Sequence, residues 1–96
     1  MKMLQDEIES DVGGLVAKLE NLGLRITGSR YDAEVFGNYV IDLDGPSSGA
    51  LRLTRDRLQY MIFGDENLLK GLGLFRAFDD REEFRQAVLT YVKADR

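Results

Sequence analysis

The part of the sequence that most constrains the fold is residues 39–63, YVIDLDGPSSGALRLTRDRLQYMIF, in which three short segments alternate apolar and polar side chains. Alternation with a period of two places every second side chain on the same face of a β-strand. The sequence DGPSSG, rich in turn-forming residues, separates the first two segments. At Arg55-Asp56-Arg57 the apolar positions change from odd to even numbers, so we expect a bulge or, more simply, a tight turn there. The stretch predicts three antiparallel strands joined by hairpins.

Helical patterns flank this stretch on both sides. Between residues 4 and 22 apolar side chains recur every three or four positions, which predicts an amphipathic helix that ends at Gly23. A second such helix is predicted after Asp79 and Glu82, whose spacing fits a capping box, by the apolar positions Phe84, Ala87, Val88 and Tyr91. The first helix also carries a patch of small residues. It indicates either a surface for close approach of another chain or, as we favour, a kink or a merely tolerated loss of helix stability: Ser10, Gly13, Gly14 and Ala17.

The remaining segments are less regular. Residues 24–36 predict one bent strand or a small hairpin, and residues 65–78 predict either a helix or a short helical turn followed by an added strand. We therefore expect a single α+β domain over residues 1–96. It has an N-terminal helix, an antiparallel sheet of three to five strands and a C-terminal helix, with both helices on one face of the sheet.

Composition narrows the functional classes. The chain has 44% hydrophobic and 31% charged residues, typical of a globular protein, and it contains neither cysteine nor histidine. Thiol and imidazole chemistry and the usual zinc sites are therefore excluded, and we expect no cofactor. No apolar run reaches the roughly 18–20 residues that span a bilayer, and the first residues are acidic where a signal peptide would be apolar. We expect a cytoplasmic protein that binds no membrane.

The net charge of −4 is unevenly distributed. Residues 1–22 carry two basic and five acidic side chains, residues 23–63 carry five of each, and residues 64–96 carry six basic and seven acidic side chains. An acidic chain repels the phosphate backbone, so we expect no nucleic acid partner.

The first candidate catalytic groups are three carboxylates on or beside the central strands. Asp42, Asp44 and Asp56 could act as acid and base or hold magnesium, but no catalytic motif has their spacing, and solvated face or turn positions explain them better. DGPSSG lacks the lysine and the following helix of a phosphate-binding loop, so a hairpin turn is favoured. We expect a protein that is not an enzyme.

A protein-binding site is the more specific hypothesis. We expect the even-numbered residues Leu58, Tyr60 and Ile62 to face the helices. In that case the opposite face of the sheet carries Val40, Met61 and Phe63 and is unusually apolar. Three arginines lie close together in the sequence, Arg52, Arg55 and Arg57. They form either a contact site for an anionic partner or, as we favour, ion pairs with neighbouring aspartates. The candidate protein-binding residues are Val40, Arg52, Arg55, Arg57, Met61 and Phe63.

Three segments carry a resemblance to a known class of proteins. They are FGNYVIDL at residues 36–43, LRLTRDRLQY at residues 51–60 and the last helix after AFDD, and together they resemble small bacterial immunity proteins of polymorphic toxin systems. The resemblance covers about the last two thirds of the chain. It implies a compact acidic α+β domain that binds and blocks a toxin.

The leading hypothesis is therefore a non-enzymatic protein-binding module, most specifically an immunity-type inhibitor of a bacterial toxin. Acidic helix residues such as Asp6, Glu9 and Glu20 could complement a basic partner. The alternative is a secretion chaperone or a structural homodimer that uses the exposed sheet face. A third hypothesis is an enzyme that uses Asp42, Asp56 and Arg52.

Overall fold

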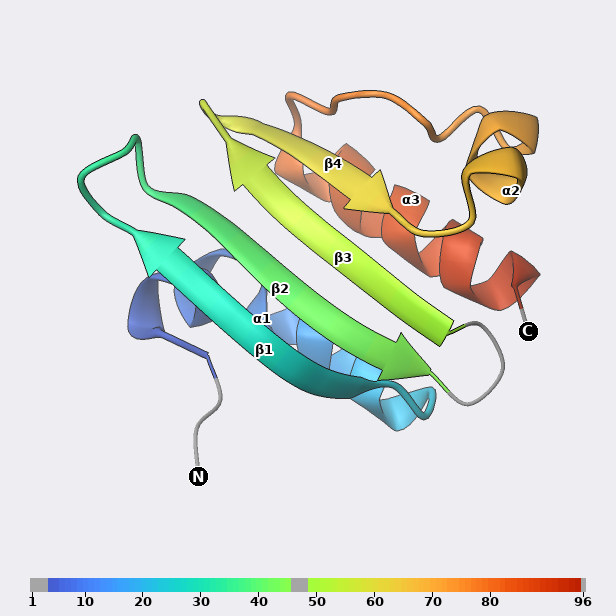
Figure 1. The fold of residues 1–96 in the computed structure, drawn as a ribbon, viewed down its shortest axis with the longest axis horizontal. Helices are drawn as coiled ribbons and strands as arrows, with labels where there is room; N and C mark the ends of the chain where they lie inside the picture. Colours follow the sequence, from blue (N-terminus) through green and yellow to red (C-terminus); the bar gives the residue numbers. More distant parts are fainter. Residues whose placement is uncertain (1–3, 46–48, 96) are drawn as a thin grey trace.

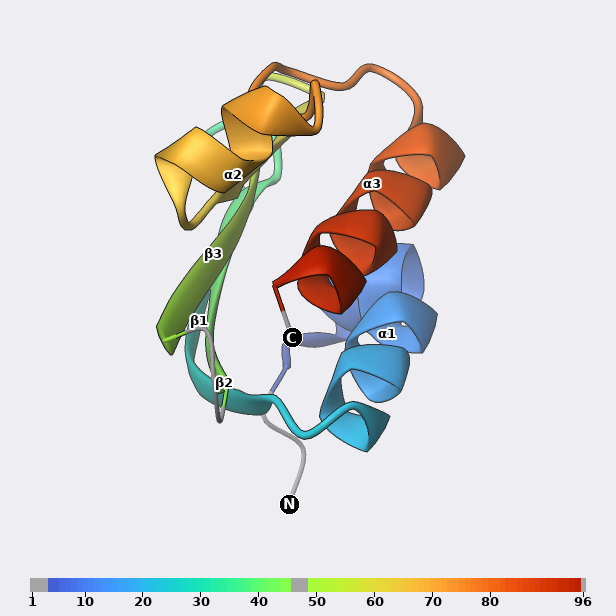
Figure 2. The ribbon, with the colours of Figure 1, turned by 90° about the vertical axis from the view of Figure 1, so that its right-hand side faces the viewer.

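The computed structural model describes residues 4–45 and 49–95, which form a four-stranded antiparallel sheet packed against two long helices (Figure 1). The elements, in chain order, are α1 (Asp6–Asn21), β1 (Arg25–Asp32), β2 (Asn38–Gly45), β3 (Gly49–Asp56), β4 (Gln59–Phe63), α2 (Glu66–Gly71) and α3 (Arg81–Ala94). The strand order β1-β2-β3-β4 makes the sheet a simple meander. The predicted α+β fold is confirmed, and α1 and α3 lie on the same face of the sheet (Figure 2).

The core lies between the sheet and these two helices. Alternate strand residues point into it, as the period of two predicts. The buried strand residues are Tyr39, Ile41, Leu43, Leu51, Leu53, Tyr60 and Ile62. The helices contribute Ile8, Val12, Leu15, Val16 and Leu19 from α1 and Phe84, Ala87, Val88, Tyr91 and Val92 from α3. Segments from opposite ends of the described chain therefore share one core.

Helix α1 is kinked at Val12, whose φ of −134° and ψ of 17° are not helical. Gly13 is buried beside the folded-back side chain of Glu9, since a Cβ on Gly13 would lie 2.6 Å from Glu9 Oε1. At the kink, Arg85 Nη2 donates to the carbonyl oxygen of Asp11 over 2.8 Å, so α3 satisfies a backbone acceptor of α1. The kink that the small residues suggested is confirmed.

The turn between β3 and β4 differs from the prediction. Its two central residues are Arg57 and Leu58, with φ of 52° and 69°, the pattern of a type I′ turn, so Arg55 and Asp56 still belong to β3. Leu58 was expected to face the helices, and this was wrong, because the turn directs its side chain into solvent. A type I′ turn matches the twist of the strands and lets them pair up to the last residue. The tip of the other predicted turn, DGPSSG, lies outside the described residues.

The less regular segments are also settled. Residues 24–36 contain one strand, β1, with a register shift between Ile26 and Gly28, rather than a hairpin. Within residues 65–78, helix α2 follows the N-cap Asp65. The added strand that was the alternative for the end of this segment is reduced to one bridge. In that bridge the backbones of Tyr60 and Phe78 exchange two hydrogen bonds of 2.8 Å, which cover part of the outer edge of β4.

Helix α3 begins one residue later than the capping box predicted. The N-cap is Asp80, whose Oδ2 accepts a hydrogen bond from the amide of Glu83 over 2.8 Å. Asp79 instead accepts a hydrogen bond from Gln59 Nε2, and Glu83 pairs with Arg76. None of the described helices is long and apolar enough to cross a membrane.

Candidate functional site

The sheet face opposite α1 and α3, here called the open face, is not covered by any described element (Figure 1, Figure 2). Strand register arranges its side chains in rows that cross the sheet. One row consists of Arg30, Val40, Thr54 and Met61, and the next of Gly28, Asp42, Arg52 and Phe63. The antiparallel pairing thus brings together residues that are far apart in the sequence.

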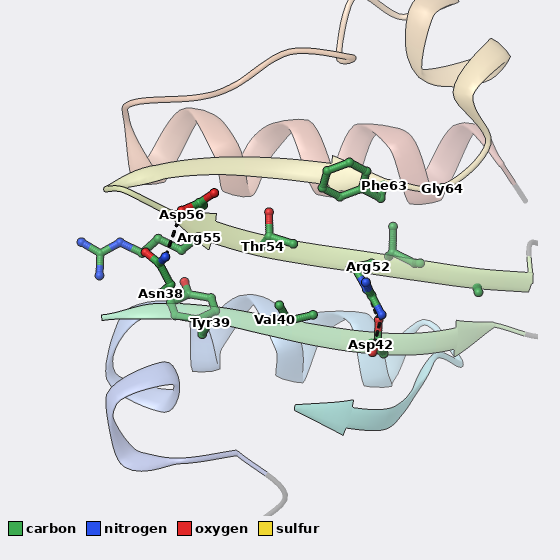
Figure 3. A pocket seen from close by; sticks show the side chains of 12 residues that line it. Asn38, Tyr39, Val40, Asp42, Arg52, Thr54, Arg55, Asp56, Phe63 and Gly64 are labelled. Atoms are coloured by element: carbon green, nitrogen blue, oxygen red, sulfur yellow. Dashed lines mark hydrogen bonds and ion pairs between the residues drawn. The ribbon is translucent and has the colours of Figure 1, made fainter. Parts of the chain in front are cut away.

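A groove of about 750 Å³ lies on the open face over β2 and β3 and reaches the end of β4 (Figure 3). It is lined by Asn38, Tyr39, Val40, Asp42, Ala50, Leu51, Arg52, Thr54, Arg55, Asp56, Phe63 and Gly64. Apolar and polar groups alternate along it, with ion-paired or hydrogen-bonded side chains at both ends (Figure 3). The groove can therefore hold apolar side chains while charged groups fix their position.

Three of the predicted site residues are apolar members of the open face. Val40 and Met61 are half-buried neighbours on either side of Thr54, and Phe63 is exposed in the adjacent row. The alternation of β2 and β4 predicted this placement correctly. Their role in binding stays a prediction.

Arg52 also lies on the open face, where it forms a two-point ion pair with Asp42 of the neighbouring strand. Arg52 Nε is 2.7 Å from Asp42 Oδ1, and Arg52 Nη2 donates to Asp42 Oδ2 over 3.2 Å. The hydrogen bond and the charge of Asp42 raise the pKa of Arg52. Of the two alternatives for this arginine, the structure shows pairing within the chain. An exposed pair of this kind adds little stability, but it fixes the orientation of a planar guanidinium group.

The other two predicted arginines are not brought together with Arg52. Arg55 shares the inward phase of β3, and its guanidinium carbon lies 5.7 Å from the centre of the Tyr60 ring. Arg55 is among the residues that line the groove, but Figure 3 shows its guanidinium group extending away from it. Arg57 lies in the β3–β4 turn, where its amide donates to Asn38 Oδ1 over 2.9 Å. Arg52, Arg55 and Arg57, which are close in the sequence, therefore lie in three different environments.

A second polar cluster, centred on Asp11, was not predicted. Its carboxylate accepts hydrogen bonds from the hydroxyl groups of Tyr39 over 2.5 Å and Tyr60 over 2.9 Å. Arg81 Nη1 lies 3.3 Å from the same carboxylate. The sequence signal was present, because Asp11 interrupts the apolar stripe of α1 between Ile8 and Leu15. A polar residue on such a stripe needs partners in the core.

These contacts explain how the cluster titrates. Burial raises the pKa of Asp11, but the hydrogen bonds from Tyr39, Tyr60 and Arg81 and the charge of Arg55 outweigh it, so the pKa is lowered. Burial and the bond to Asp11 raise the pKa of Tyr60 to about 12 and also raise the pKa of Tyr39. Near neutral pH the carboxylate stays charged and the phenols stay protonated. The cluster therefore joins elements and is poorly suited to proton transfer.

The three candidate carboxylates have different neighbours in the structure. Asp42 is paired with Arg52, Asp56 Oδ1 accepts a hydrogen bond from Asn38 Nδ2 over 2.9 Å, and Asp44 faces Arg25 and Ala50 in the strand register. Within residues 4–45 and 49–95, no three acidic side chains come close enough to hold a metal ion.

In comparisons with known proteins, no family model, no curated protein and no solved structure matches this chain. The proposed function therefore depends on the sequence and the structure.

Proposed function

We propose that this chain is a non-enzymatic protein-binding module and that the open face is its binding surface. The observation that carries the proposal is the groove of about 750 Å³ on a sheet face that no described element covers. Apolar side chains at the centre of such a surface, with charged groups around them, are the usual composition of a protein interface. Val40 and Phe63 supply apolar side chains to the groove, and Met61 lies next to it on the edge strand β4. The Asp42–Arg52 pair supplies charged groups beside them.

The scaffold favours binding without rearrangement. Strand β2 pairs with a strand on each side, and its inward residues are buried in the core. The backbone that carries the open face is therefore fixed by the sheet and by the core beneath it. A surface that is already ordered loses little conformational entropy when a partner docks. Each 100 Å² of apolar surface that a partner covers would contribute about 2.5 kcal/mol before these costs.

Within this class, we propose an immunity-type inhibitor that binds and neutralises a bacterial toxin. The net charge of −4 supports a basic partner. Complementary charge speeds encounter and disfavours wrong partners. The resemblance of residues 36–43 and 51–60 to such proteins points the same way.

Affinity purification from the native host tests the proposal. We expect the wild-type chain to retain a specific protein that the Phe63→Ser variant retains much more weakly. Phe75→Ser is the matched control, because Phe75 is 39% exposed against 41% for Phe63 but does not line the groove. Recovery of the chain alone at every salt concentration, or equal loss of the partner in both variants, would argue against the proposal.

A further inference from the structure

Three large apolar side chains are exposed at one end of the sheet, where the turn between β1 and β2 lies beside the turn between β3 and β4 (Figure 1). Val35 is 44% exposed, Phe36 67% and Leu58 58%; we call these three residues the turn surface. Asn38 holds the two turns together, because its Nδ2 donates to Asp56 Oδ1 over 2.9 Å and its Oδ1 accepts from the amide of Arg57 over 2.9 Å. The two turns that carry these side chains are thus joined to each other at one end of the sheet.

Two of its residues are held in an unfavourable backbone conformation. Phe36 has a φ of 57° and Leu58 a φ of 69°, in the left-handed region that L-residues with bulky side chains rarely adopt. Asn-Gly is the favoured pair for a type I′ turn, and asparagine or glycine would also suit position 36. The chain instead has Arg57-Leu58 at the β3–β4 turn. Leu58 is mostly exposed, so burial in the core does not compensate the cost of its backbone conformation.

Strain of this kind, in exposed apolar residues, is typical of functional surfaces. Large apolar side chains at exposed turns favour contact with another molecule over contact with water. Folding alone would be better served by smaller residues at both positions. The turn surface is therefore better explained by binding than by stability.

The charges around the turn surface indicate the kind of partner. Asp32 and Glu34 flank Val35 and Phe36, and Asp56 precedes the β3–β4 turn. Asp79 is brought to the same end by its hydrogen bond from Gln59, the first residue of β4. Neutral amides, from Asn38 and Gln59, hold Asp56 and Asp79, so their charges are not neutralised by these contacts. Arg57 in the β3–β4 turn and Arg30 in β1 are basic side chains close to this end as well. Arg55 and Arg81, which are also near in the sequence, are directed to the Tyr60 ring and to Asp11 instead.

We infer that the turn surface is a second protein-docking site, which takes a basic protein surface with an apolar pocket. The apolar side chains would enter the pocket, and the surrounding carboxylates would face lysine or arginine side chains. The inference shares with the proposed function the premise of a protein partner, but it concerns a different surface. Asn38 and Asp56 also line the groove, so the two surfaces adjoin and one partner can contact both.

The test uses a phage library of random twelve-residue peptides selected on the full chain, followed by affinity measurements with the synthetic peptides. We expect the selected peptides to carry net positive charge and apolar residues. We expect Phe36→Asn combined with Leu58→Gly to weaken their binding about tenfold or more, as loss of an anchoring side chain does. We expect salt to weaken it further. Phe63→Ser on the open face should change it less than about twofold, within the effect of a peripheral residue.

The double variant separates binding from folding. Asparagine and glycine relieve the left-handed strain, so its melting temperature should equal or exceed that of the wild type. A lower melting temperature would show that Phe36 and Leu58 serve folding, and it would overturn the inference. So would peptides with net negative charge, peptides that bind the double variant equally well, or a library that yields no enrichment. Peptides that lose binding only with Phe63→Ser would overturn it as well, while supporting the open face as the binding surface.

Discussion

Asp11 connects elements that are distant in the sequence through one carboxylate. It lies in α1, accepts hydrogen bonds from Tyr39 of β2 and Tyr60 of β4, and pairs with Arg81 of α3. Hydrogen bonds to a charged acceptor in a partly buried site are stronger than those between neutral groups. This residue should therefore fix how the helices sit on the sheet.

Replacing Asp11 tests that role. Asp11→Asn should lower the free energy of unfolding at pH 7 by about 1–3 kcal/mol, because the charge-assisted hydrogen bonds are lost. The pKa of Asp11 is lowered from 3.8 in the folded state, so its contribution is complete above pH 3.8. The contribution is lost as the pH falls through the folded pKa. The difference between wild type and variant should thus shrink in acid.

Urea denaturation at a series of pH values measures this difference. Asp42→Asn is the control, since its pair with Arg52 is exposed to solvent and should contribute little to the free energy of unfolding. An Asp11→Asn difference that stays constant from pH 7 to pH 2 would contradict the proposed linkage.

Gly64 is the residue at which the smallest change should have a large effect. A Cβ at this position would lie 2.4 Å from the hydroxyl oxygen and 2.9 Å from Cζ of the buried Tyr91. That hydroxyl accepts a hydrogen bond of 2.7 Å from the amide of Asp65, so the ring is held in place. Gly64→Ala should destabilise the fold by about 1–3 kcal/mol, as overpacking does.

A double-mutant cycle with Tyr91→Phe checks the cause. Removing the hydroxyl relieves the closest contact, so the two substitutions should cost less together than the sum of their separate effects. Strict additivity would indicate that Gly64 is needed for another reason.

Among the elements, α3 offers the clearest test of a boundary. Asp80→Ala removes the hydrogen bond to the Glu83 amide and should cost about 0.5–2 kcal/mol, as loss of an N-cap does. Asp79→Ala removes only an exposed hydrogen bond with Gln59 and should cost less. Thermal denaturation of the two variants compares them, and a larger loss for Asp79→Ala would place the cap where the sequence pattern predicted it.

The elements also show what the sequence could predict. Period-two alternation identified β2, β3 and β4 and the outward direction of Val40, Met61 and Phe63, because burial on one face selects that pattern. The same alternation contains the signal that Arg55 points inward, since it shares the odd phase of Leu51 and Leu53. For Arg55, strand phase is therefore a better guide to direction than the nearness of other arginines in the sequence.

Other features depend on information that a local pattern lacks. The turn at Arg57-Leu58 has no glycine or asparagine to mark its left-handed backbone. The Asp11 cluster joins residues up to 70 positions apart in the sequence, and only the packed fold brings them together. The bridge between Tyr60 and Phe78 likewise depends on how the loop after α2 closes over β4.

At the scale of the whole molecule, the described residues form two layers, with helices on one face of the sheet and none of these residues covering the other. Its radius of gyration, 12.4 Å, is close to the roughly 12.5 Å expected for a compact chain of this length. The longest dimensions, 34 and 29 Å, lie in the plane that Figure 1 views, with the open face toward the reader. The groove and the turn surface are both presented on this broad side or at its edge.

Oligomeric state separates the proposed module from the homodimer alternative. A module that binds a different protein should be a monomer of 10.9 kDa by light scattering at micromolar concentration. The net charge of −4 adds a mild repulsion between copies. A stable dimer that Phe63→Ser converts to a monomer would instead favour self-association through the open face.

The most direct test of the central claim, that the open face binds protein, is methyl cross-saturation by NMR with the partner recovered from the host. We predict that saturation of the partner attenuates the methyl signals of Val40 and Met61 on the open face. The methyl signals of Val88 and Leu19, buried between sheet and helices, should change little. Attenuation confined to exposed methyl groups of α1 and α3, with Val40 and Met61 unaffected, would contradict the account.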